Sequence, residues 1–212
     1  MGREILPFTV DRLSDLTGSC ASCVFWELGP ALGRRHAKPR DDKQAWLTST
    51  LLEWGTPGRV VLVDGHYAGH IMYAPPHLVP RALAFPTAPV SRDAVVLVTA
   101  RIDPEYAGQG LGRVLVQAAA KDVLRRGHRA LEAYGSRDGR AACVLPVDFL
   151  LAVGFRTTRE HAAYPRLRLD LRTALRWRGE VEQAVERLLA PVRGLGVPQP
   201  VGTAHRDDIS LN

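Results

Sequence analysis

The chain has 212 residues, which is enough for one α/β domain with a complete core and a small extension, so we expect a single domain. Its formal net charge of +6 comes mostly from arginines, which are spread over many segments and form no basic runs interleaved with aromatics. This pattern argues against a nucleic-acid partner. Three cysteines are too few for a disulfide scaffold and suit a reducing compartment.

The sequence also gives an expectation about cellular location. No apolar run approaches the roughly 20 residues needed to span a bilayer, and the first residues lack the charged, apolar and small-residue layout of a signal peptide. We therefore expect a cytoplasmic protein with no membrane partner. The preference for arginine over lysine, together with many alanines, suggests a high-GC, bacterial genome.

The N-terminal part predicts one strand and two helices. Residues 4–10 have the pattern of an opening strand, and a short helix follows with Asp11 as its cap. A longer amphipathic helix is predicted over residues 41–54, with Asp41 or Asp42 as the N-cap. These elements precede the main run of predicted strands.

A hairpin and a loop come next. Residues 59–63 and 67–73 read as two strands around the dipeptide Asp64-Gly65, which is a strong hairpin signal. Residues 74–92 contain five prolines and predict a loop.

The most informative segment runs from residue 95 to residue 127. Residues 95–102 are rich in β-branched side chains, and the strand that they predict should stop near Asp103 because Pro104 follows. Apolar residues at three- and four-residue spacings then predict a helix that begins in the sequence G-Q-G-L-G and stops at Gly127. Helix N-termini present unpaired N–H groups and a partial positive charge, so we expect an anion there.

The remaining elements complete an α/β sandwich with a mixed sheet. A strand is predicted over 129–134, a helix over 141–152, and two final strands over 155–159 and 164–171. An added helix follows the last strand, with its apolar residues on one face.

Three known glycine motifs are candidates for the segment that follows Asp103, and the spacing of the glycines distinguishes between them. A nucleoside triphosphate loop needs Gly-Lys-Ser/Thr at its end, whereas the last glycine here is followed by Arg113 and Val114. A dinucleotide fingerprint needs a third glycine three residues after the second, and that position holds Arg113 or Leu115. Both interpretations therefore fail.

The segment A-G-Q-G-L-G, residues 107–112, resembles the acyl-CoA loop of the GNAT acetyltransferase superfamily, in which Arg/Gln-x-x-Gly-x-Gly/Ala opens a helix after a strand. The sequence F-L-L-A-V-G-F-R, residues 149–156, is similar to the family's later F-Y-x-x-x-G-F segment. The resemblance covers roughly residues 58–172. Two positions depart from the pattern: Ala107 stands where the family has Arg or Gln, and Leu150 stands where many members have a tyrosine.

The resemblance implies a GNAT-like fold, with a mixed, mostly antiparallel sheet flanked by helices. Residues 1–172 would form the acyltransferase domain, in which residues 1–57 wall the acceptor site. Residues 173–192 would be the added C-terminal helix and residues 193–212 a flexible tail. The added helix would pack on the domain itself or on a second copy of the chain in a homodimer.

The resemblance also implies acetyl-CoA as the cofactor. The diphosphate would lie on backbone N–H groups of the glycine loop, and the pantetheine arm would pair with the strand that precedes it. The predicted cofactor-binding residues are Ala100, Arg101, Ile102, Ala107, Gly108, Gln109, Gly110, Leu111, Gly112 and Arg113.

In such a family, an amine attacks the thioester directly, so a base must remove a proton from the amine and an acid should meet the departing thiolate. Glu132 is the leading base because it is an acid within an otherwise apolar strand beside the expected thioester. A solvated side chain or an arginine ion pair is the alternative. Tyr134 is the leading acid, since Leu150 cannot serve, and a core tyrosine is the alternative.

Cys20 and Cys23 form a C-x-x-C pair that is followed by an aromatic segment. A redox pair and half of a zinc site are possible interpretations, but no second C-x-x-C exists, and simple packing is the plainer one. The resemblance suggests another: this segment would wall the substrate pocket. Cys143, at the start of a predicted helix, would be a nucleophile or, more simply, structural. The predicted substrate-binding residues are Cys23, Phe25, Trp26 and Glu27.

The sequence therefore leads to an acyl-CoA-dependent N-acetyltransferase acting on a primary amine. Its acceptor would be a small molecule or a protein lysine, and no metal is expected in the site. A non-catalytic acyl-CoA-binding regulatory module is the main alternative, and a zinc-stabilised binding protein is the third.

Overall fold

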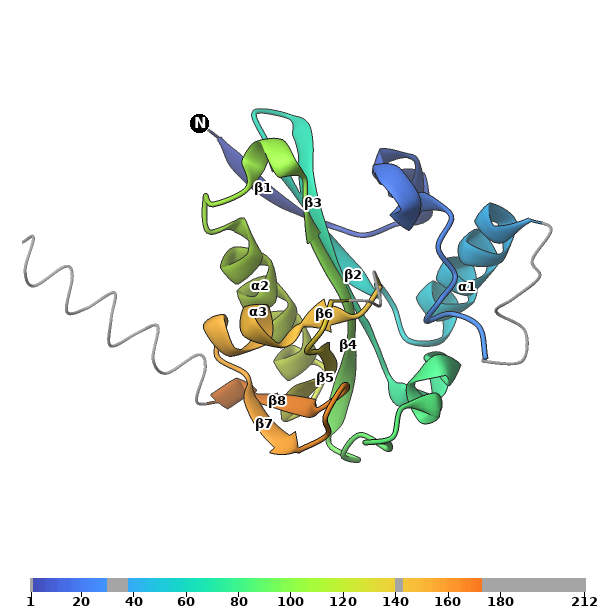
Figure 1. The fold of residues 1–212 in the computed structure, drawn as a ribbon. Helices are drawn as coiled ribbons and strands as arrows, with labels where there is room; N and C mark the ends of the chain where they lie inside the picture. The colour runs from blue at the N-terminus through green and yellow to red at the C-terminus, as the bar shows by residue number, and fades with distance from the viewer. Residues whose placement is uncertain (1, 30–37, 140–142, 173–212) are drawn as a thin grey trace, which may run out of the picture.

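A computed structural model describes residues 2–29, 38–139 and 143–172 (Figure 1). Seven strands form a continuous sheet in the order β1-β2-β3-β4-β5-β8-β7, and the short strand β6 pairs with β5 beside this path. Pairing is antiparallel except between β4 and β5 and between β5 and β6, so the expected mixed, mostly antiparallel sheet is confirmed. The strands are β1 (Arg3–Pro7), β2 (Gly58–Val63), β3 (His66–Ala74), β4 (Ala94–Ile102), β5 (Ala130–Ser136), β6 (Leu145–Pro146), β7 (Arg156–Arg159) and β8 (Arg166–Asp170).

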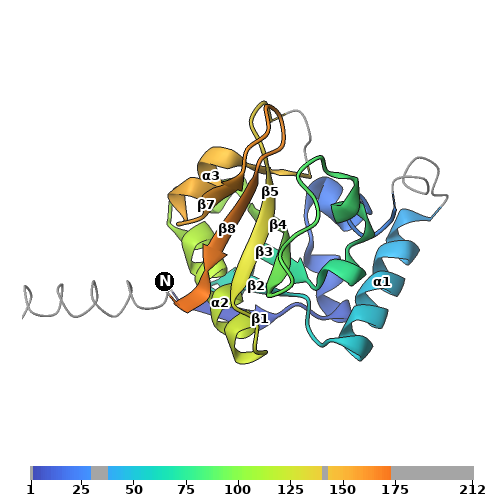
Figure 2. The same cartoon turned by 90° about the horizontal axis from the view of Figure 1, so that it is seen from below.

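Helices cover both faces of the sheet (Figures 1 and 2). Helices α2 (Leu111–Arg125) and α3 (Val147–Ala152) lie on one face, which we call the α2 face. Helix α1 (Pro39–Glu53) lies on the other, which we call the α1 face. Short 3-10 helices join α1 on that face, at Val10–Asp15 and Gly18–Ala21 before it and at Pro76–Leu78 and Pro80–Ala84 after it. Among the described residues, no helix combines the length and the apolar character required to cross a bilayer.

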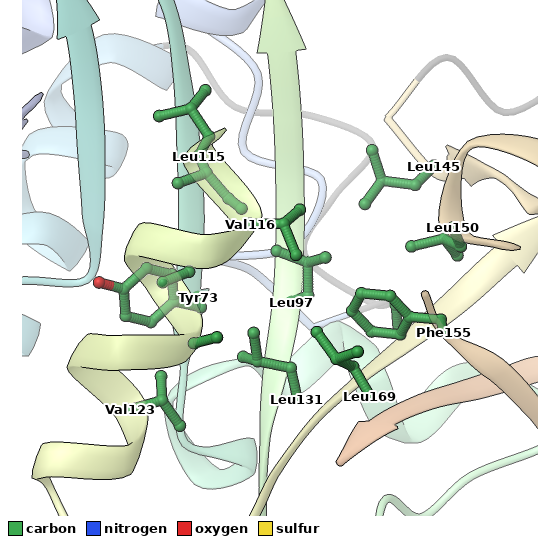
Figure 3. Close-up of a cluster of buried hydrophobic side chains, with 14 of the residues drawn as sticks. Tyr73, Leu97, Leu115, Val116, Val123, Leu131, Leu145, Leu150, Phe155 and Leu169 are labelled. Carbon is green, nitrogen blue, oxygen red and sulfur yellow. The ribbon is translucent and has the colours of Figure 1, made fainter. Parts of the chain in front are cut away.

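The α2 face buries an aliphatic core (Figure 3). Leu115 from α2, Leu97 of β4 and Leu131 of β5 all belong to this core, and each is almost completely buried. Burying one such side chain contributes about 1.5–3 kcal/mol. Leu150 of α3 is fully buried in the same cluster, near Phe155.

The α1 face buries aromatic rings together with polar and charged side chains. Trp26, Phe85 and Tyr134 stack one on another, with Phe85 and Tyr134 only 4.3 Å apart between ring centroids. Buried titratable residues lie on this side as well, which is unusual for a core. They include Glu27, Lys43, His70 and Glu132.

The predicted hairpin is confirmed: Asp64 and Gly65 connect β2 to β3 with φ values of 49° and 82°. These left-handed conformations suit the tight turns that Asp-Gly favours. The predicted strand 95–102 and the helix after it are confirmed as β4 and α2.

Several local predictions were wrong. Asp11 does not cap the first short helix, because Thr9 holds the N-cap position. Neither Asp41 nor Asp42 caps α1, because Pro39 starts this helix earlier and both acids lie in its first turn. Residues 74–92 are not simply a loop, since they contain two of the 3-10 helices named above.

The helix predicted over 141–152 is shorter than expected. It begins at Val147, after Pro146, which occupies the N-cap position. Cys143 therefore does not start a helix; it lies in the turn before β6. The added helix predicted over 173–192 and the tail over 193–212 lie outside the described residues.

Candidate active site

The glycine loop connects the end of β4 to the start of α2. Asp103 accepts a hydrogen bond from the N–H of Glu105, which fixes a 3-10 turn at Pro104–Tyr106. Gly108 and Gly110 then adopt φ values of 76°, and Gly110 is the N-cap of α2. Non-glycine residues rarely take this left-handed conformation, so the loop requires glycine at both positions.

The loop has the properties of an anion site. Both glycines are exposed, and a Cβ atom built on either one would meet no heavy atom within 4 Å. The first turn of α2 contains no acidic residue. Because the first N–H groups of a helix have no intrahelical acceptor, the backbone here presents donors to open space. The residues present therefore fit a diphosphate held by backbone groups.

Gly112, the last glycine of the loop, has a different environment. A Cβ atom at this position would lie 2.9 Å from Cε2 of Phe149 on α3. The absence of a side chain therefore permits close packing of α2 against α3, which is a structural requirement that the motif alone does not reveal.

The two arginines near the loop contact residues outside the loop. Arg113 donates a hydrogen bond from Nη2 to the carbonyl of Ala152, 2.8 Å away, and so links α2 to the end of α3. Arg101 lies with its Nη1 4.0 Å from Sγ of Cys20. Its Nε is buried and has no hydrogen-bond partner among the described residues. The exposed Ala107 and the half-buried Gln109 lie within the loop itself.

Strands β4 and β5 separate near the loop. Their parallel pairing covers Ala94–Val96 and Ala130–Glu132, whereas β4 stays paired with β3 as far as Ile102. The β5-facing edge of Ala100–Ile102 therefore has no strand neighbour among the described elements. Two successive residues of β3 pair with Thr99 and Leu97 of β4. Val98 is skipped in this pairing, so it forms a bulge in β4.

Glu132 is the last residue of β5 that pairs with β4, and it is fully buried. Its Oε1 accepts a hydrogen bond from Nη1 of Arg168 at 3.1 Å. Its Oε2 accepts one from the N–H of Ser91 at 3.1 Å and lies 3.2 Å from Nε of Arg166. The carboxylate is therefore neutralised by two arginines, which is the arrangement that a buried acid requires.

Tyr134 lies beyond the point of separation and is 1% exposed. Its hydroxyl group is buried and has no hydrogen-bond partner among the described residues. Burial raises the pKa of Tyr134 to about 12, and the Glu132 carboxylate acts in the same direction, against the charge of Arg166. The hydroxyl therefore stays protonated throughout the physiological range and can donate a hydrogen bond.

The segment that includes Cys23, Phe25, Trp26 and Glu27 packs against this tyrosine. Trp26 stacks on Tyr134 with ring centroids 6.3 Å apart. Its Nε1 donates to the carbonyl of Cys143, 2.7 Å away. Phe25 contacts Trp26 edge to face, and the Arg81 guanidinium lies 4.6 Å from the Phe25 ring centroid. The structure thus brings the predicted acid and the predicted substrate wall together.

Glu27 is anchored within this wall. Its Oε1 forms an ion pair with Nζ of Lys43 at 2.5 Å, and the Lys43 and Glu27 side chains are only 5% and 2% exposed. The same ammonium donates to the carbonyl of Cys23 at 2.8 Å. This pair fixes the N-terminal segment on α1.

Sequence reasoning missed Phe85 and Lys43. Phe85 follows a 3-10 helix in the proline-rich segment and stacks on both Trp26 and Tyr134. An aromatic residue among prolines was the available signal. Lys43 gave none, because a lysine in the first turns of an amphipathic helix normally faces water.

Comparison with known proteins decides the family. The model of the acetyltransferase (GNAT) family matches residues 23–145, which is more than half of the chain. The chain belongs to the GNAT acetyltransferase family. Acetyl-CoA is the cofactor that membership implies, and the glycine loop described above fits its diphosphate. The search of curated proteins gave no match.

Solved structures agree on the fold. The PaiA N-acetyltransferase of Thermoplasma acidophilum in complex with coenzyme A matches with a TM-score of 0.55 and 14% identity, over 80% of this chain and 99% of that one. An N-acetyltransferase of Staphylococcus aureus matches with a TM-score of 0.55 and 15% identity, over 81% and 99%. An aminoglycoside acetyltransferase in complex with coenzyme A matches with a TM-score of 0.55 and 15% identity, over 83% and 98%.

The structure shows the environments of the two residues that depart from the GNAT pattern. Leu150 faces the aliphatic core and is completely buried, so it presents no polar group to the site. Ala107 is exposed and offers the loop only its backbone. Among the described residues, no group of three or more His, Cys, Asp and Glu side chains could hold a metal ion.

Proposed function

We propose that this protein is an N-acetyltransferase that transfers an acetyl group from CoA to a primary amine by direct attack within a ternary complex. One observation carries the proposal. The left-handed glycines at the start of α2 present open backbone at the place where β4 has separated from β5. A phosphate site and an unpaired strand edge therefore lie side by side, as a long ligand with a phosphate end and an amide-containing arm requires.

The glycine loop and the end of β4 are the elements that would hold the cofactor. N–H groups of residues 108–113 would bind the diphosphate, and the backbone of residues 100–102 would pair with the pantetheine arm. When bound, the cofactor supplies an activated acyl group as a thioester.

Tyr134 is the residue that we assign to the leaving group. It lies on β5 past the point of separation, and its buried hydroxyl lacks a partner among the described residues. An unpaired buried hydroxyl costs free energy, so its retention supports a role toward a bound molecule. A pKa of about 12 keeps the proton on the oxygen, where it can be donated to a developing thiolate.

Glu132 remains the candidate base, but its contacts also support a purely structural role. Both oxygens already face donors from β8 or Ser91. Glu132→Gln distinguishes the two roles. A base would lose about a hundredfold or more in kcat at unchanged stability. An ion-pair anchor would lose stability and retain most of kcat once the variant is folded.

The acceptor amine would approach on the α1 face, along the wall formed by Cys23, Phe25 and Trp26. Phe25 and Cys23 are half-buried, so they are the members of this wall that an acceptor can reach. Small amines and protein lysines both remain candidates for the acceptor, and a screen of both classes is the direct way to decide between them.

Thermal melting with CoA and acetyl-CoA tests the cofactor site. A ligand at 100 times its Kd stabilises by about 2.7 kcal/mol, which raises the Tm of a chain of this size by about 5–10 °C. Gly108→Ala should abolish this rise. Gly65→Ala is the matched control, because Gly65 has a φ of 82° and equally open surroundings but lies in the β2–β3 turn.

Both substitutions impose the same backbone strain, so both should lower the Tm of the free protein by a similar amount. Only Gly108→Ala should lose the response to CoA. An unresponsive wild type at millimolar CoA, or equal responses in the two variants, would contradict the proposal.

A non-catalytic acyl-CoA-binding module is the second candidate, and the burial of Leu150 in the core favours it. Such a module would show the same thermal response to CoA. It would transfer no acetyl group to any amine, and Tyr134→Phe would leave CoA binding unchanged.

A further inference from the structure

Two thiols from distant parts of the chain meet beside the aromatic stack. Sγ of Cys23 lies 2.8 Å from Sγ of Cys143, although 120 positions separate them in the sequence. Both are free cysteines, and both are half-buried, so a small reagent can reach them. The sulfur atoms are already closer than ordinary contact, and only a small further approach would bring them to the disulfide distance of about 2.05 Å.

Buried side chains hold the backbone on each side of this thiol pair. The Lys43 ammonium binds the carbonyl of Cys23, and the Trp26 indole donates to the carbonyl of Cys143. Lys43 is itself fixed by its ion pair with Glu27. The backbone of each cysteine is therefore held by a buried side chain while the two sulfurs face each other.

The two thiols differ in acidity. A hydrogen bond from the Cys143 thiol is the largest influence and lowers the pKa of Cys23 to about 6, helped by the N–H of Phe25 and the charge of Lys43. Burial and the Glu27 carboxylate act in the opposite direction. The same hydrogen bond raises the pKa of Cys143, so this residue stays a thiol. The pair thus combines a nucleophilic thiolate with a neighbouring proton-bearing partner.

We propose that Cys23 and Cys143 form an oxidation site at which a hydroperoxide converts the two thiols into an intramolecular disulfide. The Cys23 thiolate attacks the peroxide oxygen, forms a sulfenic acid and releases hydroxide or an alkoxide. The Cys143 sulfur then attacks the Cys23 sulfur, and its proton leaves with the displaced hydroxyl group as water. Both electrons removed from the thiols reduce the peroxide, and a small thiol reductant reverses the reaction.

Cys20 provides an internal comparison. It belongs to the same C-x-x-C sequence as Cys23, but its sulfur lies 4.0 Å from Nη1 of Arg101. The sequence pattern would pair Cys20 with Cys23, whereas the structure pairs Cys23 with Cys143.

The disulfide would tie the N-terminal wall to the turn before β6, next to Trp26 and Tyr134. It would close a loop of about 120 residues, and such a long cross-link restricts the unfolded chain strongly. We expect the oxidised protein to melt about 10 °C above the reduced one. This effect does not depend on acyl transfer, so it can be measured whatever the acceptor is.

The test uses the full chain, reduced and then exposed to a small excess of hydrogen peroxide before remaining thiols are alkylated. One thiol should be alkylated in place of three, and trypsin should release the peptides 13–34 and 141–156 as one linked species. Cys20→Ser should still form the link and show the rise in Tm, and a reductant should remove both. Cys23→Ser and Cys143→Ser should form neither.

Three results would overturn the proposal. One is a peptide 13–34 that is 2 Da lighter with Cys143 alkylated, which would show a Cys20–Cys23 bond. Another is oxidation to sulfinic acid with no link. The third is a link found only between two copies of the chain. If Cys20→Ser failed to fold, peptide sequencing of the linked wild-type species would identify the bonded cysteines directly.

Discussion

Two buried tyrosines on opposite faces of the sheet show how differently those faces are built. Tyr73 on the α2 face donates its hydroxyl to Oδ2 of Asp122 at 2.7 Å. Tyr134 on the α1 face has no partner for its hydroxyl among the described residues. Both rings are almost completely buried. The same side chain is therefore fully satisfied on one face and left available on the other.

The charged groups on the two faces also differ, in their access to solvent. On the α2 face, Asp122 is bound by Arg59, Arg125 and Arg126, and the Arg125 side chain remains 72% exposed. On the α1 face, Lys43 and Glu27 pair with almost no access to solvent. The α2 face pairs its buried polar groups and carries the glycine loop, whereas the α1 face keeps polar groups in a costly environment, as functional sites commonly do.

The largest expected effect is on catalysis. Tyr134→Phe should lower kcat by about a hundredfold or more in an acetyl-transfer assay, because it removes the proposed donor to the thiolate. Stability should change little, since the hydroxyl has no partner to lose among the described residues. Tyr164→Phe is the control from the same cluster, with its ring 5.5 Å from Phe85, and it should retain kcat. Equal kcat in both variants would remove Tyr134 from the mechanism.

The buried ion pair gives the next largest effect. Lys43→Met leaves the Glu27 carboxylate buried without its counter-charge and should cost about 3 kcal/mol of unfolding free energy. Adding Glu27→Gln should recover most of this loss. Arg137→Met breaks an exposed pair with Glu160 and should cost under about 1 kcal/mol in the same urea titrations. A single variant as stable as the wild type would show that water reaches this site.

The sequence predicts the α2 face much better than the α1 face. β4, the glycine loop and α2 are contiguous, and their pattern of β-branched residues, glycines and helical spacing reports local structure that the fold keeps. The stack of Trp26, Phe85 and Tyr134 joins three distant segments. No local pattern specifies such a meeting.

The contacts of single residues were equally hidden in the sequence. A glutamate in an apolar strand indicates a buried acid, but nothing in the sequence shows that Arg166 and Arg168 lie beside Glu132, because antiparallel pairing of β5 with β8 creates that contact. The approach of Cys143 to Cys23 depends on a turn that was predicted to be helix. The pairing of β5 with β8 decided the first contact, and the start of α3 at Val147 decided the second.

Acid sensitivity should come mainly from the α1 face. Burial, with the charges of Lys43 and Arg101, lowers the pKa of His70 to about 3. Keeping His70 neutral therefore costs no stability above pH 6.5, and stability is lost as the pH falls from 6.5 toward 3. At pH 4.5 the loss should be about 2–3 kcal/mol relative to pH 7.

Urea titrations at both pH values measure this loss, and His70→Gln should reduce it by that amount. The exposed His66→Gln should leave the loss unchanged. His128, which packs against Trp54 beside the α2 face, also has a lowered pKa and should give a smaller change in the same direction. A wild type with equal stability at both pH values would contradict the assignment to His70.

Tyr73→Phe completes the comparison with the smallest effect. It removes one charge-assisted hydrogen bond to Asp122 and should cost about 1–2 kcal/mol of unfolding free energy. The loss stays small because Arg59 and Arg126 still satisfy the carboxylate. Acetyl transfer should be unchanged at a temperature where the variant is folded. Tyr73→Phe would then affect stability alone and Tyr134→Phe activity alone, whereas similar profiles for both variants would mean that the two faces do not divide scaffold from chemistry.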